Sequence, residues 1–163
     1  MSIPSPYDRY QTVVAPEWVD VNDHMNAKFY YFVFYDAGIH FATYLGLGEG
    51  YPAKHGKGQA VVESHTTFQR EFRLGDKIGV RSYLLGFDHK RIHFFHEMIN
   101  MEDGGCAATM EQLELHVDLT ARRSTTFSED LIARFSDVAA AHANCARSNV
   151  IGRAVTPTKQ AAR

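Results

Sequence analysis

Residues 27–47, AKFYYFVFYDAGIHFATYLGL, decide the fold of this chain, because they combine many aromatic side chains with few polar ones. The polar side chains that interrupt the stretch are Lys28, Asp36, His40 and Thr43. At 100° per residue these positions fall within an arc of roughly 120°, which leaves the rest of the helix surface apolar. We therefore predict a helix that is buried on most sides and about 30 Å long at 1.5 Å per residue. Glycines at 46 and 48 are typical of its C-terminal end.

Strand-forming segments flank this helix on both sides. Tyr10–Trp18 precedes it, and Pro16 restricts the end of that segment to an edge or an exit from the sheet. Four further strands, separated by turn residues, are predicted over 59–72, 77–87, 90–99 and 107–118. This order predicts an α+β fold in which an antiparallel sheet of about five strands is wrapped round the long central helix. An ordinary α+β sandwich with the helix on one face is the alternative.

Two patterns within these later segments bear on which side chains face the core. In the third of the four strands, Ile92 and Phe94 share a face with His96, whereas in the fourth Leu113 and Leu115 share one. After the strands, residues 128–142 form a second predicted helix, with a serine as N-cap and two acidic residues in its first turn.

The length of 163 residues fits a single domain. We place it at residues 10–152, between a flexible leader over 1–9 and a flexible tail over 153–163. A net charge of −2 without a basic run argues against nucleic acid as a partner. No signal-peptide pattern and no apolar span of about 18 residues is found, so no membrane contact is expected. The 2 cysteines form no CxxC pair, and we expect a reduced, cytoplasmic protein.

A polar heptapeptide, DVNDHMN at residues 20–26, stands directly before the long helix. It places carboxylates, an imidazole and side-chain amides next to the unpaired N–H groups of a helix N-terminus. Hydrolysis at a carbonyl carbon needs a carboxylate that attacks or activates water, and donors for the oxyanion. Asp20 and the amides from Met25 to Lys28 are candidates for these two tasks. The alternative is an Asx turn and helix cap, in which Asn and Asp only satisfy backbone groups.

The segments W-V-D at 18–20 and N-x-H-M-N at 22–26, followed by a helix with a tyrosine, resemble the hotdog-fold acyl-CoA thioesterases related to 4-hydroxybenzoyl-CoA thioesterase. The resemblance continues through VESHTTF, LGDKIGV, DHKRIHFFHEM and AATMEQLELHVD, and is greatest for the betainyl-CoA thioesterases of carnitine breakdown. One departure is Asp23, which stands where the family usually has Gly. This aspartate tolerates a positive φ less well than Gly and adds a negative charge beside Asp20.

This resemblance implies a hotdog fold, an acyl-CoA substrate and a homodimer or dimer of dimers with clefts at the interface; no cofactor is expected. It also implies that Asp20 is the catalytic carboxylate. His24, Asn26 and Tyr30 stand at matching positions of the motif. By this interpretation His24 and Asn26 orient the loop or the thioester.

Further candidates lie outside the heptapeptide. Phe34 belongs to the aromatic helix that would wall the acyl pocket, where ring faces can hold a quaternary ammonium, although such a stripe is also typical of a core. Glu63 and His65 lie two apart on a strand and hence on one face, where they line the same cleft or form cross-strand pairs. Lys90 and Arg91 are candidates for the CoA phosphates, with a solvated charge cluster as the alternative.

No metal site is expected despite the 9 histidines. His89 and His93 would be about 13 Å apart on a strand, and His93 and His96 would point to opposite faces. Neither pair can chelate a metal ion.

Two rival functions remain open at this point. An (R)-specific enoyl-CoA hydratase carries the motif Asp-x-Asn-Pro-x-His, which DVNDH resembles superficially, but here the proline is missing and the histidine is one residue closer. A non-catalytic acyl-CoA binding module is the second rival, and Asp23 is the feature in its favour. An enzyme would release free thiol from acyl-CoA catalytically, whereas a binding module would not.

Overall fold

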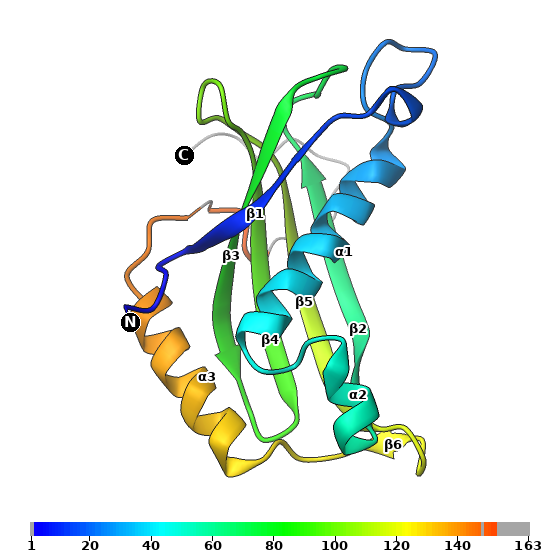
Figure 1. Cartoon of the computed structure of the whole chain (residues 1–163). Coiled ribbons are helices and arrows are strands. Elements are labelled where there is room, and N and C mark those ends of the chain that lie inside the picture. Colours follow the sequence, from blue (N-terminus) through cyan, green and yellow to red (C-terminus); the bar gives the residue numbers. More distant parts are fainter. Residues whose placement is uncertain (1, 148, 153–163) are drawn as a thin grey trace.

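Residues 2–147 and 149–152 are described by the computed structural model of the chain (Figure 1). The elements follow in the order β1 (Tyr7–Val13), η1 (Pro16–Trp18), α1 (Ala27–Tyr44), α2 (Gly50–His55), β2 (Lys57–Phe68), β3 (Lys77–Phe87), β4 (Arg91–Asn100), β5 (Cys106–Asp118), β6 (Arg123–Ser124) and α3 (Glu129–His142). None of the helices in this part of the chain has the length and apolar character needed to cross a membrane.

One antiparallel sheet contains all the strands, in the spatial order β1-β3-β4-β5-β2, with the short β6 beside β5. Strands β3, β4 and β5 are joined by short turns and therefore pair in sequence order. β2 reaches the far edge next to β5 after the chain has passed through α1 and α2. α1 lies lengthwise against one face of the sheet (Figure 1). The predicted α+β architecture, an antiparallel sheet curled round a long central helix, is confirmed.

The apolar surface of α1 is divided between the core and the surface of the chain. The side chains that it buries recur at helical spacing: Tyr30, Val33, Phe34, Ala37, Phe41 and Ala42. On its other side Tyr31, Phe32 and Tyr35 are 46%, 55% and 53% exposed. The prediction that most sides of this helix are buried is therefore wrong for the single chain, because the sheet covers only one side.

The core lies between α1 and the face of the sheet that we call the inner face. Met98 packs with the N-terminal half of α1 and Phe94 with its C-terminal half, where the Phe41 and Phe94 ring centroids are 5.6 Å apart. On the opposite, outer face, Phe95 of β4 is buried together with Val150 of the C-terminal segment. The alternation predicted for β4 is thus present, but both of its faces are partly covered.

Several boundaries differ from the predicted ones. The first strand begins at Tyr7, which is 4% exposed, so the predicted boundary between leader and domain after residue 9 lies inside β1. This strand ends at Val13, before η1, and β2 ends at Phe68 rather than at residue 72. The short helix α2 lies between the long helix and β2, in a segment for which the sequence had predicted neither helix nor strand. The predicted tail over 153–163 lies outside the described residues.

Candidate active site

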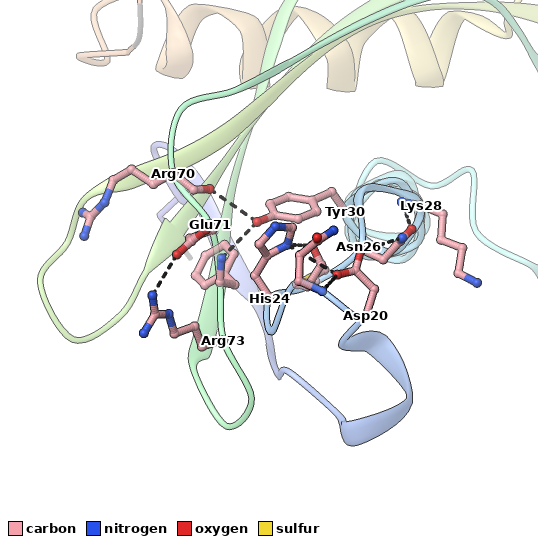
Figure 2. A network of polar contacts seen from close by, with 11 residues as sticks. Asp20, His24, Asn26, Lys28, Tyr30, Arg70, Glu71 and Arg73 are labelled. Carbon is pink, nitrogen blue, oxygen red and sulfur yellow. Dashed lines mark hydrogen bonds and ion pairs between the residues drawn. The ribbon is translucent and has the colours of Figure 1, made fainter.

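The polar heptapeptide forms a closed loop between η1 and α1 (Figure 2). The Asp20 N–H donates to the His24 carbonyl at 3.1 Å, and the Asp23 N–H donates to the Asp20 carbonyl at 3.0 Å. The loop ends where the Asn26 N–H donates to the Trp18 carbonyl at 2.8 Å. Because the chain returns on itself in this way, the Asp20 side chain lies beside the first turn of α1.

Asp23 adopts the backbone conformation that a glycine would take most easily. Its φ angle is 62°, in the left-handed region, which Asp and Asn tolerate better than most other residues with a Cβ. The hydrogen bond from the Asp23 N–H closes the loop in this conformation. The replacement of the family's usual Gly is therefore compatible with the loop, and the main argument for a non-catalytic binding module loses its structural basis.

The Asp20 carboxylate is held by two N–H donors and remains accessible. Its Oδ1 accepts from the Asn22 N–H and its Oδ2 from the Asn26 side-chain amide, both at 2.9 Å. The Asn22 N–H and then the Asn26 amide hold the pKa of Asp20 below its usual value of 3.8. The side chain is 22% exposed, and His24 Nδ1 lies 4.0 Å from Oδ1. Asp20 is therefore ionised at neutral pH and within reach of solvent.

Most N–H groups around the start of α1 already have protein acceptors. The Met25 N–H donates to the Phe72 carbonyl at 2.7 Å, and the Lys28 N–H donates to Asn26 Oδ1 at 3.1 Å. Asn26 thus caps the helix with its oxygen while its amide nitrogen holds Asp20. Among the described residues, none outside the helix offers a backbone acceptor to the Ala27 N–H. Because Ala27 lies in the first turn of α1, its N–H has no acceptor within the helix either. The predicted group of oxyanion donors from Met25 to Lys28 is thereby reduced to the Ala27 N–H.

Three predicted binding residues point into the protein. Tyr30 is 3% exposed, and its hydroxyl accepts from the Phe72 N–H at 3.0 Å and donates to the Arg70 carbonyl at 3.3 Å. Met25 is 1% exposed and belongs to the core. Phe34 is fully buried, although part of it lines a cavity between α1 and the sheet. Tyr30 and Met25 therefore hold the loop in place instead of presenting side chains to solvent.

Glu63 and His65 share a face of β2, as predicted, but it is not the face against which α1 packs. They line a pocket of about 450 Å³ on the outer face together with His93 and Glu111, whose side chains are hydrogen-bonded at 2.8 Å. The structure does not bring them to Asp20 within one chain. In the described part of the chain, no group of three or more His, Cys, Asp or Glu side chains is arranged to hold a metal ion.

Lys90 and Arg91 lie at the end of the sheet farthest from Asp20. Arg91 begins β4 and is ion-paired with Asp88 at 2.6 Å in the β3–β4 turn. Met98, which packs in the cluster that contains Met25, is seven residues further along β4, or about 23 Å at 3.3 Å per residue. The two basic residues are therefore about 23 Å along the sheet from the end at which Asp20 lies, and their assignment to the CoA phosphates stays a prediction.

The segment between β2 and β3 also contacts the heptapeptide loop, and none of its residues was among the predicted site residues. Figure 2 shows Arg70, Glu71 and Arg73 beside the heptapeptide loop. Arg70 is ion-paired with Asp103 at 2.7 Å and Arg73 with Glu71 at 3.0 Å. Their sequence signal is weak, because the strand predicted over 59–72 included Arg70 and Glu71.

The site thus consists of an accessible, ionised carboxylate at the N-terminus of a helix that packs against one face of an antiparallel sheet. The chain belongs to the thioesterase-like superfamily, whose family model matches residues 14–135. It is 35% identical over 146 residues to the betainyl-CoA thioesterase of Pseudomonas aeruginosa, covering 90% of this chain and 92% of that protein. It is also 32% identical to the L-carnitine dehydrogenase/betainyl-CoA thioesterase of Rhizobium meliloti, covering 92% of this chain but 30% of that longer protein.

Two solved structures have the same fold. A Staphylococcus aureus protein in complex with CoA superposes with a TM-score of 0.86 at 25% identity, covering 96% of this chain and 99% of that chain. A Pseudomonas putida protein assigned as a thioesterase gives a TM-score of 0.82 at 27% identity, covering 97% and 100%. The predicted hotdog fold and the predicted thioester hydrolase class are confirmed.

Proposed function

We propose that this protein hydrolyses acyl-CoA thioesters and that Asp20 is its catalytic carboxylate. The observation that carries the proposal is the state of Asp20, which is ionised, accessible and fixed by the Asn22 N–H and the Asn26 amide at the start of α1. The structure contains the Asx turn, in the bond from the Asn22 N–H to Asp20, and the helix cap, which Asn26 makes. Asp20 also accepts from the Asn26 amide and stays accessible, which neither the turn nor the cap requires. The relatives named as betainyl-CoA thioesterases and the S. aureus complex with CoA support the substrate class.

Two routes lead from this geometry to the same products. In the first, Asp20 attacks the thioester carbonyl carbon, the C–S bond breaks to release CoA, and water hydrolyses the resulting anhydride. In the second, Asp20 takes a proton from a water molecule as that water attacks the carbonyl. Both yield a carboxylate and free CoA. An acylated Asp20 peptide in rapidly quenched single turnovers would identify the first route.

The remaining residues of the loop stabilise charge and position. In either route negative charge develops on the carbonyl oxygen, and the Ala27 N–H with the positive end of the α1 dipole is placed to receive it. The Asn26 amide keeps the carboxylate oriented, and His24, 4.0 Å from Asp20, lies on the accessible side of the loop. We assign orientation to Asn26 and contact with the thioester to His24.

A second copy of this chain completes the site in our proposal. Strand β2 is 12 residues long, forms a sheet edge and exposes Val62 and Phe68 to 53% and 54%, next to the exposed aromatic side of α1. A long exposed edge strand of this kind is a template for pairing with another chain. The homodimer would place residues of the second chain beside the Asp20 loop of the first. Light scattering at micromolar concentration should give at least a dimer, and Val62→Lys should weaken it; a monomeric wild type contradicts this part.

The acyl group that we propose is betainyl, with short acyl groups as competitors. The support is the 35% identity to the P. aeruginosa betainyl-CoA thioesterase along almost the whole of both chains. Thiol release from betainyl-CoA, short aliphatic acyl-CoAs and 4-hydroxybenzoyl-CoA would rank these substrates.

The role of Asp20 is tested by Asp20→Asn beside Asp23→Asn, a matched change three residues further along the same loop. Asp20→Asn keeps the shape but removes the charge, and we expect kcat/KM to fall at least about a hundredfold, as for loss of a central catalytic group. Asp23→Asn keeps the left-handed backbone and should stay within about threefold of wild type. Full activity of Asp20→Asn would contradict the assignment, and absence of turnover on the whole panel would contradict the enzymatic proposal.

A further inference from the structure

A second feature lies on the inner face, away from the Asp20 loop: a cavity of about 250 Å³ between α1 and the strands β2 and β5. Its walls come from α1, from the segment around α2 and from the two strands. Its lining residues include Phe34, Tyr35, Gly38, Gln59, Gln112 and Glu114. Phe34 is fully buried and Gln112 is 7% exposed, whereas Tyr35 is 53% exposed, so the cavity has a closed floor and an open rim.

Glu114 gives the cavity a negative charge that the protein does not neutralise. Its two carboxylate oxygens accept from the side-chain amides of Gln59 at 3.1 Å and Gln112 at 2.5 Å, which are neutral groups. None of the described residues that line the cavity is Lys, Arg or His. Burial raises the pKa of Glu114, as expected for a carboxylate without a nearby cation.

The nearest histidine along β5 does not supply the missing positive charge. His116 Nδ1 lies 3.2 Å from the Thr125 carbonyl and therefore carries the hydrogen, while Nε2 is bonded to the Tyr51 hydroxyl at 3.0 Å. Burial lowers the pKa of His116, so the ring is neutral at physiological pH. Neither the two amides nor this imidazole compensates the charge of Glu114, and Glu49, which is exposed, is the second acidic residue of the cavity lining.

The other walls fit a group that is bulky, cationic and unable to donate hydrogen bonds. Phe34 and Tyr35 bring aromatic rings to the cavity, and ring faces attract quaternary ammonium ions. Gly38 leaves open space beside them, because a Cβ built there would meet nothing within 4 Å. A primary ammonium would need acceptors for its hydrogens, whereas a trimethylammonium group needs only a counter-charge and an apolar wall.

We propose that this cavity binds the quaternary ammonium end of a cationic acyl group and that Glu114 is its counter-charge and the residue that sets acyl specificity. This inference rests on the proposed acyl-CoA thioesterase function.

The position of the cavity also decides whether it acts with Asp20 of its own chain or with Asp20 of a second copy. Gly38 is twelve residues from the cap Asn26, or about 18 Å along α1, whereas one methylene separates the carbonyl from the ammonium in a betainyl group. The cavity therefore serves Asp20 of a second copy of the chain.

The charge is tested with two acyl groups of equal shape, betainyl-CoA and its neutral isostere 3,3-dimethylbutanoyl-CoA. We expect wild type to prefer betainyl-CoA by at least tenfold in kcat/KM, and Glu114→Gln to lose that preference while it still hydrolyses the isostere, which shows that it is folded. Glu102→Gln, an exposed Glu in the β4–β5 turn, is the control and should keep the preference. An unchanged ratio in Glu114→Gln, or no preference in wild type, overturns the inference but leaves the thioesterase function intact.

If neither thioester turns over, the proposed function fails and the cavity is tested by binding alone. Glycine betaine should then bind to wild type by calorimetry and at least tenfold more weakly to Glu114→Gln; equal or absent binding overturns the inference.

The pairing of the cavity with Asp20 of a second copy is tested by co-expressing the Asp20→Asn and Glu114→Gln variants. Random dimers should regain about a quarter of wild-type betainyl-CoA activity, since half of them contain one intact site of two. Activity no greater than the mean of the two parents overturns that pairing.

Discussion

Replacing Tyr30 by Phe removes a single hydroxyl, and the result distinguishes a structural tyrosine from one that binds substrate. The resemblance to thioesterases places Tyr30 at a motif position, but its hydroxyl joins α1 to the segment between β2 and β3, through the Phe72 N–H at 3.0 Å and the Arg70 carbonyl at 3.3 Å. Phe72 is fully buried. In Tyr30→Phe its N–H would have no acceptor and no access to water.

The magnitude follows from this loss. A buried donor that is left unpaired costs about 1–3 kcal/mol. The carbonyl of Arg70 belongs to an exposed residue and can accept a hydrogen bond from water instead, so its loss adds little. We therefore expect the free energy of unfolding to fall by about 2 kcal/mol. For a chain of this length that corresponds to a Tm about 4–8 °C lower.

The assay combines thermal and urea unfolding at one fixed protein concentration with thioester kinetics. Tyr31→Phe is the matched control, because Tyr31 is the next residue of the same helix and 46% exposed; its stability should change by less than about 0.5 kcal/mol. With a structural Tyr30, stability falls while kcat/KM stays within about threefold at a temperature where the variant is folded. Unchanged stability together with a large loss of kcat/KM would refute the reasoning and return Tyr30 to the substrate site.

Three further predictions concern the loop and the core. Asn26→Ala removes the helix cap and a donor to Asp20, so urea unfolding should show a loss of about 1 kcal/mol. The pKa of Asp20 should rise in this variant, which would move the acidic limb of kcat/KM to higher pH. Asp23→Gly relieves the positive φ but increases the entropy of the unfolded chain, so urea unfolding should show a change of less than about 1 kcal/mol; a larger loss would mean that the Asp23 side chain supports the loop. Burial lowers the pKa of His96 from 6.5 to about 4, so between these values the unfolded chain binds a proton that the folded protein does not. The free energy of unfolding should therefore fall by about 3 kcal/mol from pH 7 to pH 4, and His96→Gln should show a shallower decrease in urea titrations.

The parts of the fold that were predictable depend on the pattern of residues that are close together in the sequence. The start of α1 follows from the polar loop before it and the apolar periodicity after it, and the structure begins the helix at Ala27 as predicted. The spacing of two residues within a strand also predicted that Glu63 and His65 share a face. Which face that is depends on pairing with β5, where an irregularity between Val61 and Glu63 shifts the register. A one-residue shift moves every following side chain to the opposite face, and the residue pattern of β2 alone does not predict such a shift.

The fourth predicted strand shows why the cavity was missed. The alternation of Leu113 and Leu115 with Gln112 and Glu114 would ordinarily place the leucines toward the core. In the structure the polar residues face α1 and line the cavity, while Leu113 lines the pocket on the outer face. This reversal of the usual orientation of polar and apolar side chains in β5 does not stabilise the folded chain by itself, because it turns polar side chains toward the core. A conflict between pattern and burial of this kind is expected where a binding site imposes its own requirements.

Asp20 and Glu114 are two carboxylates to which the environment gives opposite properties. Asp20 is accessible and held by N–H donors, which lower its pKa, so it is ionised whatever acyl group is bound. Glu114 is partly buried, and its desolvation raises its pKa, which a bound cation would lower again. A neutral acyl group would leave the Glu114 charge desolvated and unpaired, or force it to take up a proton, and either outcome costs free energy. The cavity therefore discriminates by penalising neutral acyl groups as well as by attracting cationic ones, and this selectivity does not require any change in the chemistry at Asp20.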